Sequence, residues 1–307
     1  MKIAVRCGWM LLLAPCFVLL TGCGARTSDI KIDGSSTVYP ISQAVAEEFG
    51  IEHGAVRITV GQTGTSGGME QFCAGEIDIC NASRPIDETE IKKCADAKIE
   101  YLELPVAYDG LSVVVNPAND WCDSLTVEQL KELWRPGSAI NTWKDLDPEW
   151  PAEKIKLYGA DADSGTFDYF TEAIVGKKRE CRDDYMPSSN DNTLVTGVKE
   201  DKYSLGYFGL SYYEQNKDSL KLLGIDPGDG TAVQPTLETV RSGAYKPLSR
   251  PLLIYVNNRV LGTPAGVEFI TYYLDNAQKL SEEVDYVPLT DDELAKAKET
   301  LGAALKK

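Results

Sequence analysis

Two glycine-containing loops, each between a predicted strand and a predicted helix, constrain this chain more than any other feature. Gly34-Ser35-Ser36-Thr37 follows the apolar residues of 30–32 and precedes apolar residues at helical spacing over 41–49. Asp163-Ser164-Gly165-Thr166 lies between a strand-like run and a second helical pattern. A helix N-terminus carries unpaired N–H groups and a partial positive charge, and small hydroxyl residues add donors there. The sequence therefore predicts two anion-binding helix starts.

Residues 1–22 have the organisation of a lipoprotein signal peptide. Lys2 and Arg6 precede an apolar run over 9–20, which is too short to span a membrane comfortably. Leu20-Thr21-Gly22-Cys23 then matches a lipobox, so we expect cleavage before Cys23, acylation of its sulfur and a lipidated tether over 23–28. An ordinary secretory signal and an N-terminal membrane anchor are the alternatives. The body of the protein is expected outside the cytoplasm, attached to the cell envelope by lipid alone.

The mature chain is acidic and long enough for two lobes. Removing 22 of the 307 residues leaves 285, more than a single core usually holds. The full chain carries 31 basic and 47 acidic residues, a net charge of −16, and losing Lys2 and Arg6 makes it −18. An acidic surface disfavours nucleic acid and anionic membranes as partners. A recessed site can still bind a small anion through local dipoles and an arginine.

Five cysteines remain in the body of the protein after Cys23, so at least one has no partner. They are Cys73, Cys80, Cys94, Cys122 and Cys181. Cys80 ends an apolar strand-like run and is expected to be a buried free thiol. Pairs 73–94, on flanking helices, and 122–181, in polar loops, are favoured, although spacing does not determine connectivity. A metal site is disfavoured, because there is no CxxC pair and the only histidine, His53, lies in a predicted turn.

Strand and helix patterns alternate along the whole chain. The apolar runs 56–60, 111–115 and 252–256 predict strands, and the spacings within 126–129 and 290–293 predict capping boxes at helix starts. Strands that alternate with helices indicate an α/β fold with mainly parallel sheets and crossover helices.

Seven short stretches, spread in order over the mature chain, carry a resemblance to a known family. They are Asp33-Gly34-Ser35-Ser36-Thr37-Val38-Tyr39-Pro40, Gly64-Thr65-Ser66-Gly67-Gly68, Gly75-Glu76-Ile77-Asp78-Ile79, Asn81-Ala82-Ser83-Arg84-Pro85-Ile86, Asp163-Ser164-Gly165-Thr166-Phe167-Asp168-Tyr169-Phe170, Leu205-Gly206-Tyr207-Phe208-Gly209 and Leu248-Ser249-Arg250-Pro251-Leu252. Together they resemble the phosphate-binding proteins of bacterial phosphate ABC importers, the PstS family, nearest its SphX-like branch.

The resemblance implies an architecture and a function. It implies a two-lobed periplasmic-binding-protein fold of type II, with lobe 1 over 29–108 plus 253–307 and lobe 2 over 109–252. One inorganic phosphate would be bound between the lobes and delivered to the permease subunits of an ABC importer. The protein would act as a monomer, without a cofactor, a metal or a catalytic activity.

The resemblance also implies a set of phosphate ligands. Carried over residue by residue, they are Ser36, Thr37, Thr65, Ser83, Arg84, Ser164, Gly165 and Thr166. Arg84 follows a strand and precedes a proline, so we expect its guanidinium to project into the cleft and bind two phosphate oxygens at once. Without the resemblance, Arg84 is better interpreted as a surface ion-pair residue, and Ser36 and Thr65 as ordinary helix caps.

The chain departs from the family pattern at two positions. Many members have an arginine where Ala160 stands, and we infer that Arg84 replaces that cation. Many also have an aspartate where Ser83 stands. A buried acceptor discriminates phosphate, which keeps a proton at neutral pH, from sulfate, which does not. Asp163 is the candidate for this acceptor, with Asp161 and Asp78 as alternatives, and a simple N-cap role is an equal interpretation of Asp163.

Two other classes of function also fit the sequence. A secreted phosphatase could use the same phosphate-cradling loops, although the chain lacks an evident metal cluster or nucleophile–base pair. A lipoprotein sensor or adhesin could have kept the fold and lost transport.

Overall fold

The computed structural model describes residues 28–162 and 164–306, so the predicted signal peptide, Cys23 and Asp163 lie outside the described residues. The strands are β1 (Ser28–Gly34), β2 (Val56–Val60), β3 (Ile79–Ala82), β4 (Tyr101–Val115), β5 (Ser124–Thr126), β6 (Lys156–Ala160), β7 (Met186–Ser188), β8 (Ser204–Gly209), β9 (Lys221–Leu222), β10 (Gly224–Asp226), β11 (Ser249–Asn257) and β12 (Val287–Pro288). The helices are α1 (Tyr39–Glu52), α2 (Thr65–Cys73), α3 (Glu88–Asp96), α4 (Val127–Trp134), α5 (Trp143–Leu146), α6 (Gly165–Phe170), the π-helix η1 (Thr171–Val175), α7 (Asp191–Glu200), α8 (Leu210–Asn216), the 3-10 helix η2 (Lys217–Ser219), α9 (Leu237–Arg241), α10 (Asn258–Leu261), α11 (Pro264–Glu283) and α12 (Asp291–Ala304). Within this described part, no helix is both long and apolar enough to cross a membrane.

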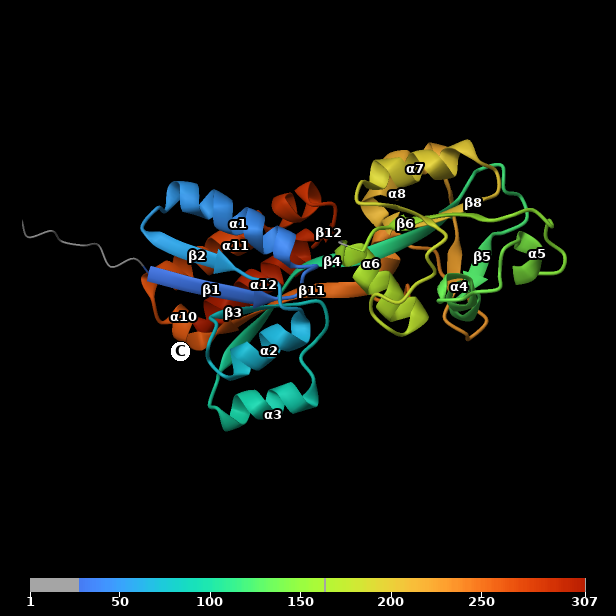
Figure 1. Cartoon of the computed structure of the whole chain (residues 1–307). Coiled ribbons are helices and arrows are strands. Elements are labelled where there is room, and N and C mark those ends of the chain that lie inside the picture. Colours follow the sequence, from blue (N-terminus) through green and yellow to red (C-terminus); the bar gives the residue numbers. More distant parts are fainter. Residues whose placement is uncertain (1–27, 163, 307) are drawn as a thin grey trace, which may run out of the picture.

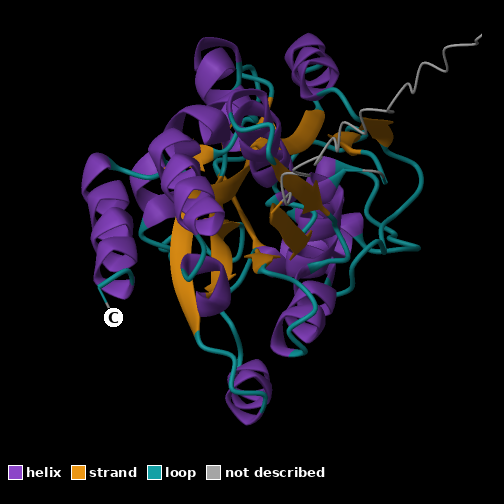
Figure 2. Ribbon diagram, turned by 90° about the vertical axis from the view of Figure 1, so that its left-hand side faces the viewer, coloured by secondary structure: helices purple, strands orange, loops and turns teal. Residues whose placement is uncertain are grey.

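Two long strands connect the two halves of the molecule. The main sheet has the order β2-β1-β3-β11-β4-β8-β6-β7, with β12 and β9 pairing onto β4. β4 and β11 pair antiparallel from Tyr101 opposite Asn257 to Gly110 opposite Ser249. Beyond Gly110, β4 continues into the other half and pairs with β8. Figure 1 shows β4 and β11 running between the two groups of elements, and Figure 2 shows helices around the strands.

The α/β fold class is confirmed, but the sheet is mixed rather than mainly parallel. β1 pairs parallel with β2 and β3, and β6 pairs parallel with β7 and β8. Among the described strands, every antiparallel pair includes β4 or β11. The reason is topological. The chain crosses between the halves along β4 and returns along β11, so these two neighbours run in opposite directions.

The two largest clusters of buried apolar side chains lie on opposite sides of this crossing. One draws its buried members from 30–107 and 252–301, and the other draws them from 111–248 together with Val287. Each half therefore has its own hydrophobic core, as independent lobes require. The lobe boundaries at 108/109 and 252/253 stay a prediction, and the separation of the two cores supports them.

Local sequence signals correctly located two helix starts. The Thr126 side chain accepts from the Gln129 backbone N–H at 3.0 Å, and the Gln129 side chain accepts from the Thr126 N–H at 2.9 Å. Thr290 and Glu293 form the same reciprocal pair at the start of α12. These boxes need only residues three positions apart, which explains why the sequence alone predicted them.

A disulfide joins Cys73 to Cys94, as the sequence predicted. It connects the end of α2 to α3, two helices that pack side by side on one lobe (Figure 1). Cys80 is fully buried in β3 with a free thiol, which was also predicted.

The predicted pairing of Cys122 with Cys181 is wrong, because both cysteines are free. The two thiols lie in different surroundings: Cys122 is beside Lys221, whereas Cys181 is beside Arg182. Burial raises the pKa of Cys122 to about 12 and that of Cys181 to about 11, which keeps both as unreactive thiols. Cys122 is buried in the core of its lobe, and Cys181 packs against the same core.

Candidate anion-binding site

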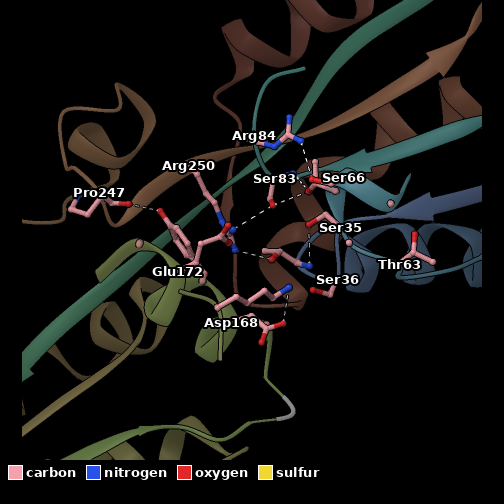
Figure 3. Close-up of a pocket in the computed structure, with 18 of the residues that line it drawn as sticks. Ser35, Ser36, Thr63, Ser66, Ser83, Arg84, Asp168, Glu172, Pro247 and Arg250 are labelled. Atoms are coloured by element: carbon pink, nitrogen blue, oxygen red, sulfur yellow. Dashed lines mark hydrogen bonds and ion pairs between the residues drawn. The ribbon is translucent and has the colours of Figure 1, made fainter. Parts of the chain in front are cut away.

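A cavity of about 450 Å³ lies where the loops before α1, α2 and α6 meet the start of β11 (Figure 3). It is lined by six of the residues expected from the sequence, namely Ser36, Thr37, Thr65, Ser83, Arg84 and Gly165. Ser164 and Thr166 flank Gly165 but do not line the cavity, and Asp163 lies outside the described residues. Residues from separate parts of the chain therefore meet at one point.

Close glycine packing brings the first two loops together. Gly34 has φ +133°, and a Cβ there would lie 2.2 Å from the backbone oxygen of Asn81. A Cβ on Gly68 would lie 2.5 Å from the Gly34 Cα. The Gly64 N–H also donates to the Gly34 carbonyl at 2.7 Å. Only glycines allow this approach, which sets the starts of α1 and α2 side by side.

The starts of α1 and α2 differ from that of α6 in how they are capped. In α1 and α2 no side chain hydrogen-bonds to the first turn at the N-cap. In α6 the Ser164 hydroxyl accepts from the Thr166 N–H at 3.1 Å, so Ser164 acts as an ordinary cap. A Cβ on Gly165 would lie 3.7 Å from the Thr37 Oγ1, so the start of α6 directly faces the start of α1. The uncapped starts of α1 and α2 thus border a space, and the start of α6 lies on its opposite side.

Arg250 supplies a cation at the centre of this space, and sequence reasoning did not assign it. Its Nη2 donates to the Thr37 Oγ1 at 2.7 Å, and its Nη1 donates to the Ser83 Oγ at 3.3 Å. The guanidinium lies over the Tyr169 ring, 3.5 Å from the ring centroid. Figure 3 shows Arg250 reaching from β11 toward the serine and threonine side chains. The arginine therefore links both crossing strands and the hydroxyl cluster.

Asp109 holds the other side of the Arg250 guanidinium. Its Oδ2 accepts from Nε at 3.1 Å and from Nη2 at 2.9 Å. The Asp109 side chain is 5% exposed and that of Arg250 is 14% exposed, so this is a nearly buried ion pair. Burial raises the pKa of Asp109, and the positive charge of Arg250 opposes that rise. The carboxylate fixes the arginine while neutralising much of its charge.

Tyr169 completes the support of Arg250 from the opposite lobe. Its hydroxyl donates to the Pro247 carbonyl at 2.8 Å, which orients the ring beneath the guanidinium. Burial raises the pKa of Tyr169, so the phenol remains neutral. A neutral aromatic face stabilises a cation without removing its hydrogen-bond donors.

Arg84 lines the cavity at its edge rather than reaching into its centre (Figure 3). Its Nη1 and Nη2 donate to the two carboxylate oxygens of Glu90 at 2.9 and 2.7 Å. Its Nη2 also donates to the Ser66 Oγ at 3.2 Å. The hydrogen bonds with Glu90 raise the pKa of Arg84. Both terminal nitrogens of the Arg84 guanidinium therefore donate to the Glu90 carboxylate.

Of the acidic candidates from the sequence, Asp78 and Asp161 do not line the cavity, and Asp163 lies outside the described residues. Asp78 accepts from the Lys31 N–H at 2.9 Å and pairs with Arg259 at 3.0 Å, outside the set of cavity-lining residues. Among the residues that the structure describes, the carboxylates that line the cavity are Asp168 and Glu172, on α6 and η1. Sequence reasoning singled out neither of them.

One signal in the sequence could have identified Arg250. The predicted lobe boundaries, at 108/109 and 252/253, lie close to Asp109 and Arg250, and in the structure these two residues are direct cross-strand partners. The two segments that connect the lobes must run side by side. Opposite charges on them, at Asp109 and Arg250, therefore indicate an ion pair at the hinge. Arg250 also stands between a serine and a proline, as Arg84 does.

Comparison with known proteins identifies the family. Residues 22–277 match the family model described as the PBP superfamily domain. The chain belongs to the PBP superfamily. Within this superfamily, it is 47% identical over 288 residues to Protein SphX of Synechocystis sp., covering 91% of this chain and 85% of that protein. It is 40% identical over 270 residues to the phosphate-binding protein PstS of Staphylococcus saprophyticus, covering 87% and 82%.

A solved structure of the superfamily matches the whole arrangement. The crystal structure of a possible phosphate binding protein from Planctomyces limnophilus has a TM-score of 0.87 and 45% identity, covering 91% of this chain and 99% of that one. The family resemblance and the fold class derived from the sequence are thereby confirmed.

Proposed function

We propose that the protein binds inorganic phosphate outside the cytoplasm and delivers it to an ABC importer as a lipoprotein. The observation that carries this proposal is the meeting of two uncapped helix starts, a hydroxyl cluster and Arg250 in one cleft. Such a site offers many hydrogen-bond donors to a small tetrahedral oxyanion. The relatives named for phosphate binding support this choice of anion.

The phosphate ligands follow from the arrangement of donors. We assign oxygen contacts to the backbone N–H groups of Ser36 and Thr65 and to the hydroxyls of Ser36, Thr37, Thr65 and Ser83, because the Thr37 N–H already donates to the Ser35 Oγ at 3.2 Å. Gly165, facing Thr37, adds its N–H donor from the other lobe, with Ser164 and Thr166 shaping its turn. Asp163 stays a candidate that lies outside the described residues.

The position of the principal cation changes in this proposal. Arg250 takes the role that the sequence suggested for Arg84, because it contacts Thr37 and Ser83 directly. Arg84 remains at the rim, where Glu90 holds it. A guanidinium at the floor of the cleft can bind phosphate oxygens with its remaining donor directions.

The crossing strands provide a hinge for closure around the ligand. Helix starts from both lobes face the cleft, so separating the lobes would dismantle the donor shell. Binding should therefore favour the closed arrangement. Lipidation at Cys23 would keep this body close to a membrane permease, and the protein would bind without chemical turnover.

Calorimetric titration of the mature protein with phosphate, sulfate and arsenate tests the proposal. We expect one phosphate per monomer, compaction of the protein in small-angle scattering on phosphate addition, and no release of chromophore from a phosphomonoester. A protein that bound no phosphate under these conditions, or that hydrolysed the ester, would contradict it.

A further inference from the structure

The floor of the cleft offers donors rather than acceptors. Arg250 can only donate, so the Thr37 and Ser83 hydroxyl oxygens accept from it and their own hydrogens point elsewhere. The Thr65 Oγ1 likewise accepts from the Ser83 N–H at 3.2 Å, and it lies 3.2 Å from the Ser83 Oγ, so one of these two hydroxyl hydrogens joins the pair and the other can be donated to a ligand. A shell of donors binds every tetrahedral oxyanion alike. Discrimination between a protonated and an unprotonated anion needs an acceptor at the cleft.

Two of the carboxylates near the cleft are already committed to cations. The Asp109 Oδ2 accepts two hydrogen bonds from Arg250. Asp168 uses one oxygen for the Arg179 Nε at 2.8 Å and the other for the Lys178 Nζ at 2.9 Å. Turning either carboxylate toward a ligand would leave a cation without its partner.

Glu172 is different from both. It lines the cleft from the η1 π-helix, four residues after Asp168, and its side chain is exposed. Across the described ranges 28–162 and 164–306, Glu172 makes no ion pair and no side-chain hydrogen bond. Figure 3 shows it on the same side of the cleft as Arg250. Its acceptor oxygens are therefore available to a ligand.

An uncommitted carboxylate at an anion site has a definite consequence. It repels any anion that brings no hydrogen, and it forms a charge-assisted hydrogen bond with one that does. Phosphate and arsenate keep a proton at neutral pH, whereas sulfate does not. The same side chain thus favours one class of oxyanion and opposes the other.

We propose that Glu172 is the specificity-determining residue of the cleft and accepts the hydrogen bond of a protonated tetrahedral oxyanion. This inference rests on the proposed function and assigns to Glu172 the role that sequence reasoning gave to Asp163, Asp161 or Asp78. The preference for a protonated oxyanion comes from the lobe that carries α6 and η1. Most of the affinity for the oxyanion comes from donors on the other lobe and from Arg250.

The test compares Glu172→Gln with the matched control Glu180→Gln. Glu180 lies eight residues away, pairs with Lys177 on the surface and does not line the cleft, so both variants change the net charge equally. Phosphate and sulfate affinities are measured by calorimetry at one ionic strength, on the lipid-free mature protein. We expect the phosphate-to-sulfate affinity ratio to fall about tenfold in Glu172→Gln, as loss of one charge-assisted hydrogen bond predicts. Glu180→Gln should leave the ratio unchanged.

Three outcomes separate the possibilities. Equal gains for both anions in Glu172→Gln would mean simple charge repulsion and would overturn the inference. An unchanged ratio in that variant, with a changed ratio in Asp163→Asn, would overturn it in favour of Asp163. A wild-type protein that binds no phosphate would instead refute the proposed function, before any variant is compared. Because Glu172 is exposed, thermal unfolding without ligand should match that of the wild type.

Discussion

The tripeptide Ser-Arg-Pro occurs twice in this chain, at 83–85 and at 249–251, and its two arginines have different surroundings. Arg84 follows β3 and Arg250 lies in β11, and these two strands are antiparallel neighbours. Arg84 is held by Glu90 and its side chain is 36% exposed. Arg250 is held by Asp109 over the ring of Tyr169 and is 14% exposed. The same local sequence thus produces a rim ion pair in one place and the cation of the cleft in the other.

The partner of each arginine explains the difference. Glu90 lies six residues after Arg84 and also completes the capping box of α3, so this pair forms within one local segment. Asp109 is 141 residues from Arg250 in sequence and reaches it only through the register of β4 with β11. Arg84, held by a partner close in sequence, therefore lies beside α3. Arg250, held by a partner on the neighbouring crossing strand, lies at the junction of the lobes.

Removing the cleft arginine should have the largest effect. We expect Arg250→Ala to weaken phosphate binding by about 2–5 kcal/mol, because a desolvated charge partner of the anion is lost. Arg84→Ala should cost less than about 1 kcal/mol, as expected of a partly exposed pair. Calorimetric titration of both variants with phosphate measures the difference.

Arg250→Lys serves as the second variant, since Arg250→Ala leaves Asp109 buried without a partner and risks misfolding. The lysine keeps the charge but loses the planar fork, so it should also bind phosphate more weakly than the wild type. A larger loss at position 84 would restore Arg84 as the principal cation, and equal losses would contradict the assignment of Arg250 as the principal one.

The aromatic support of Arg250 should have an intermediate effect. Tyr169→Leu removes the ring beneath the guanidinium and should weaken phosphate binding by about 1 kcal/mol. Tyr169→Phe keeps the ring and loses only the hydrogen bond to Pro247, so it should bind almost as the wild type does. If Tyr169→Leu and Tyr169→Phe bind phosphate equally well, the stacking of the ring on Arg250 does not contribute to phosphate affinity.

Releasing the rim arginine should have the smallest effect on binding. Glu90→Gln frees the Arg84 guanidinium from its carboxylate, yet we expect phosphate affinity to change by less than about 0.5 kcal/mol. The same variant should lower the free energy of unfolding by less than about 1 kcal/mol, because a glutamine can still complete the α3 capping box and only the ion pair with the partly exposed Arg84 is weakened. Titration and urea unfolding of one preparation measure both quantities. Clearly tighter phosphate binding would show that a freed Arg84 reaches the ligand.

Local patterns predicted much of the fold and part of the site. The helix starts at Thr126 and Thr290 were predicted without coordinates, and the disulfide between Cys73 and Cys94 was the favoured pairing. The signals for the helix starts lie within a few residues, where propensity and capping operate directly. The pairing of Cys122 with Cys181 failed because loop composition does not reveal which loops fold onto a core.

The sequence by itself determined that small hydroxyl and glycine residues stand at the helix starts over 34–37, 64–68 and 164–166. It did so because strand and helix periods and glycine spacing are local properties. Only the tertiary structure decided which charges reach the space between those helix starts. The antiparallel register of β4 and β11 joins Asp109 to Arg250, and the position of η1 brings Glu172 to the same cleft. Contacts between distant residues depend on the packing of whole lobes, and no local pattern encodes them.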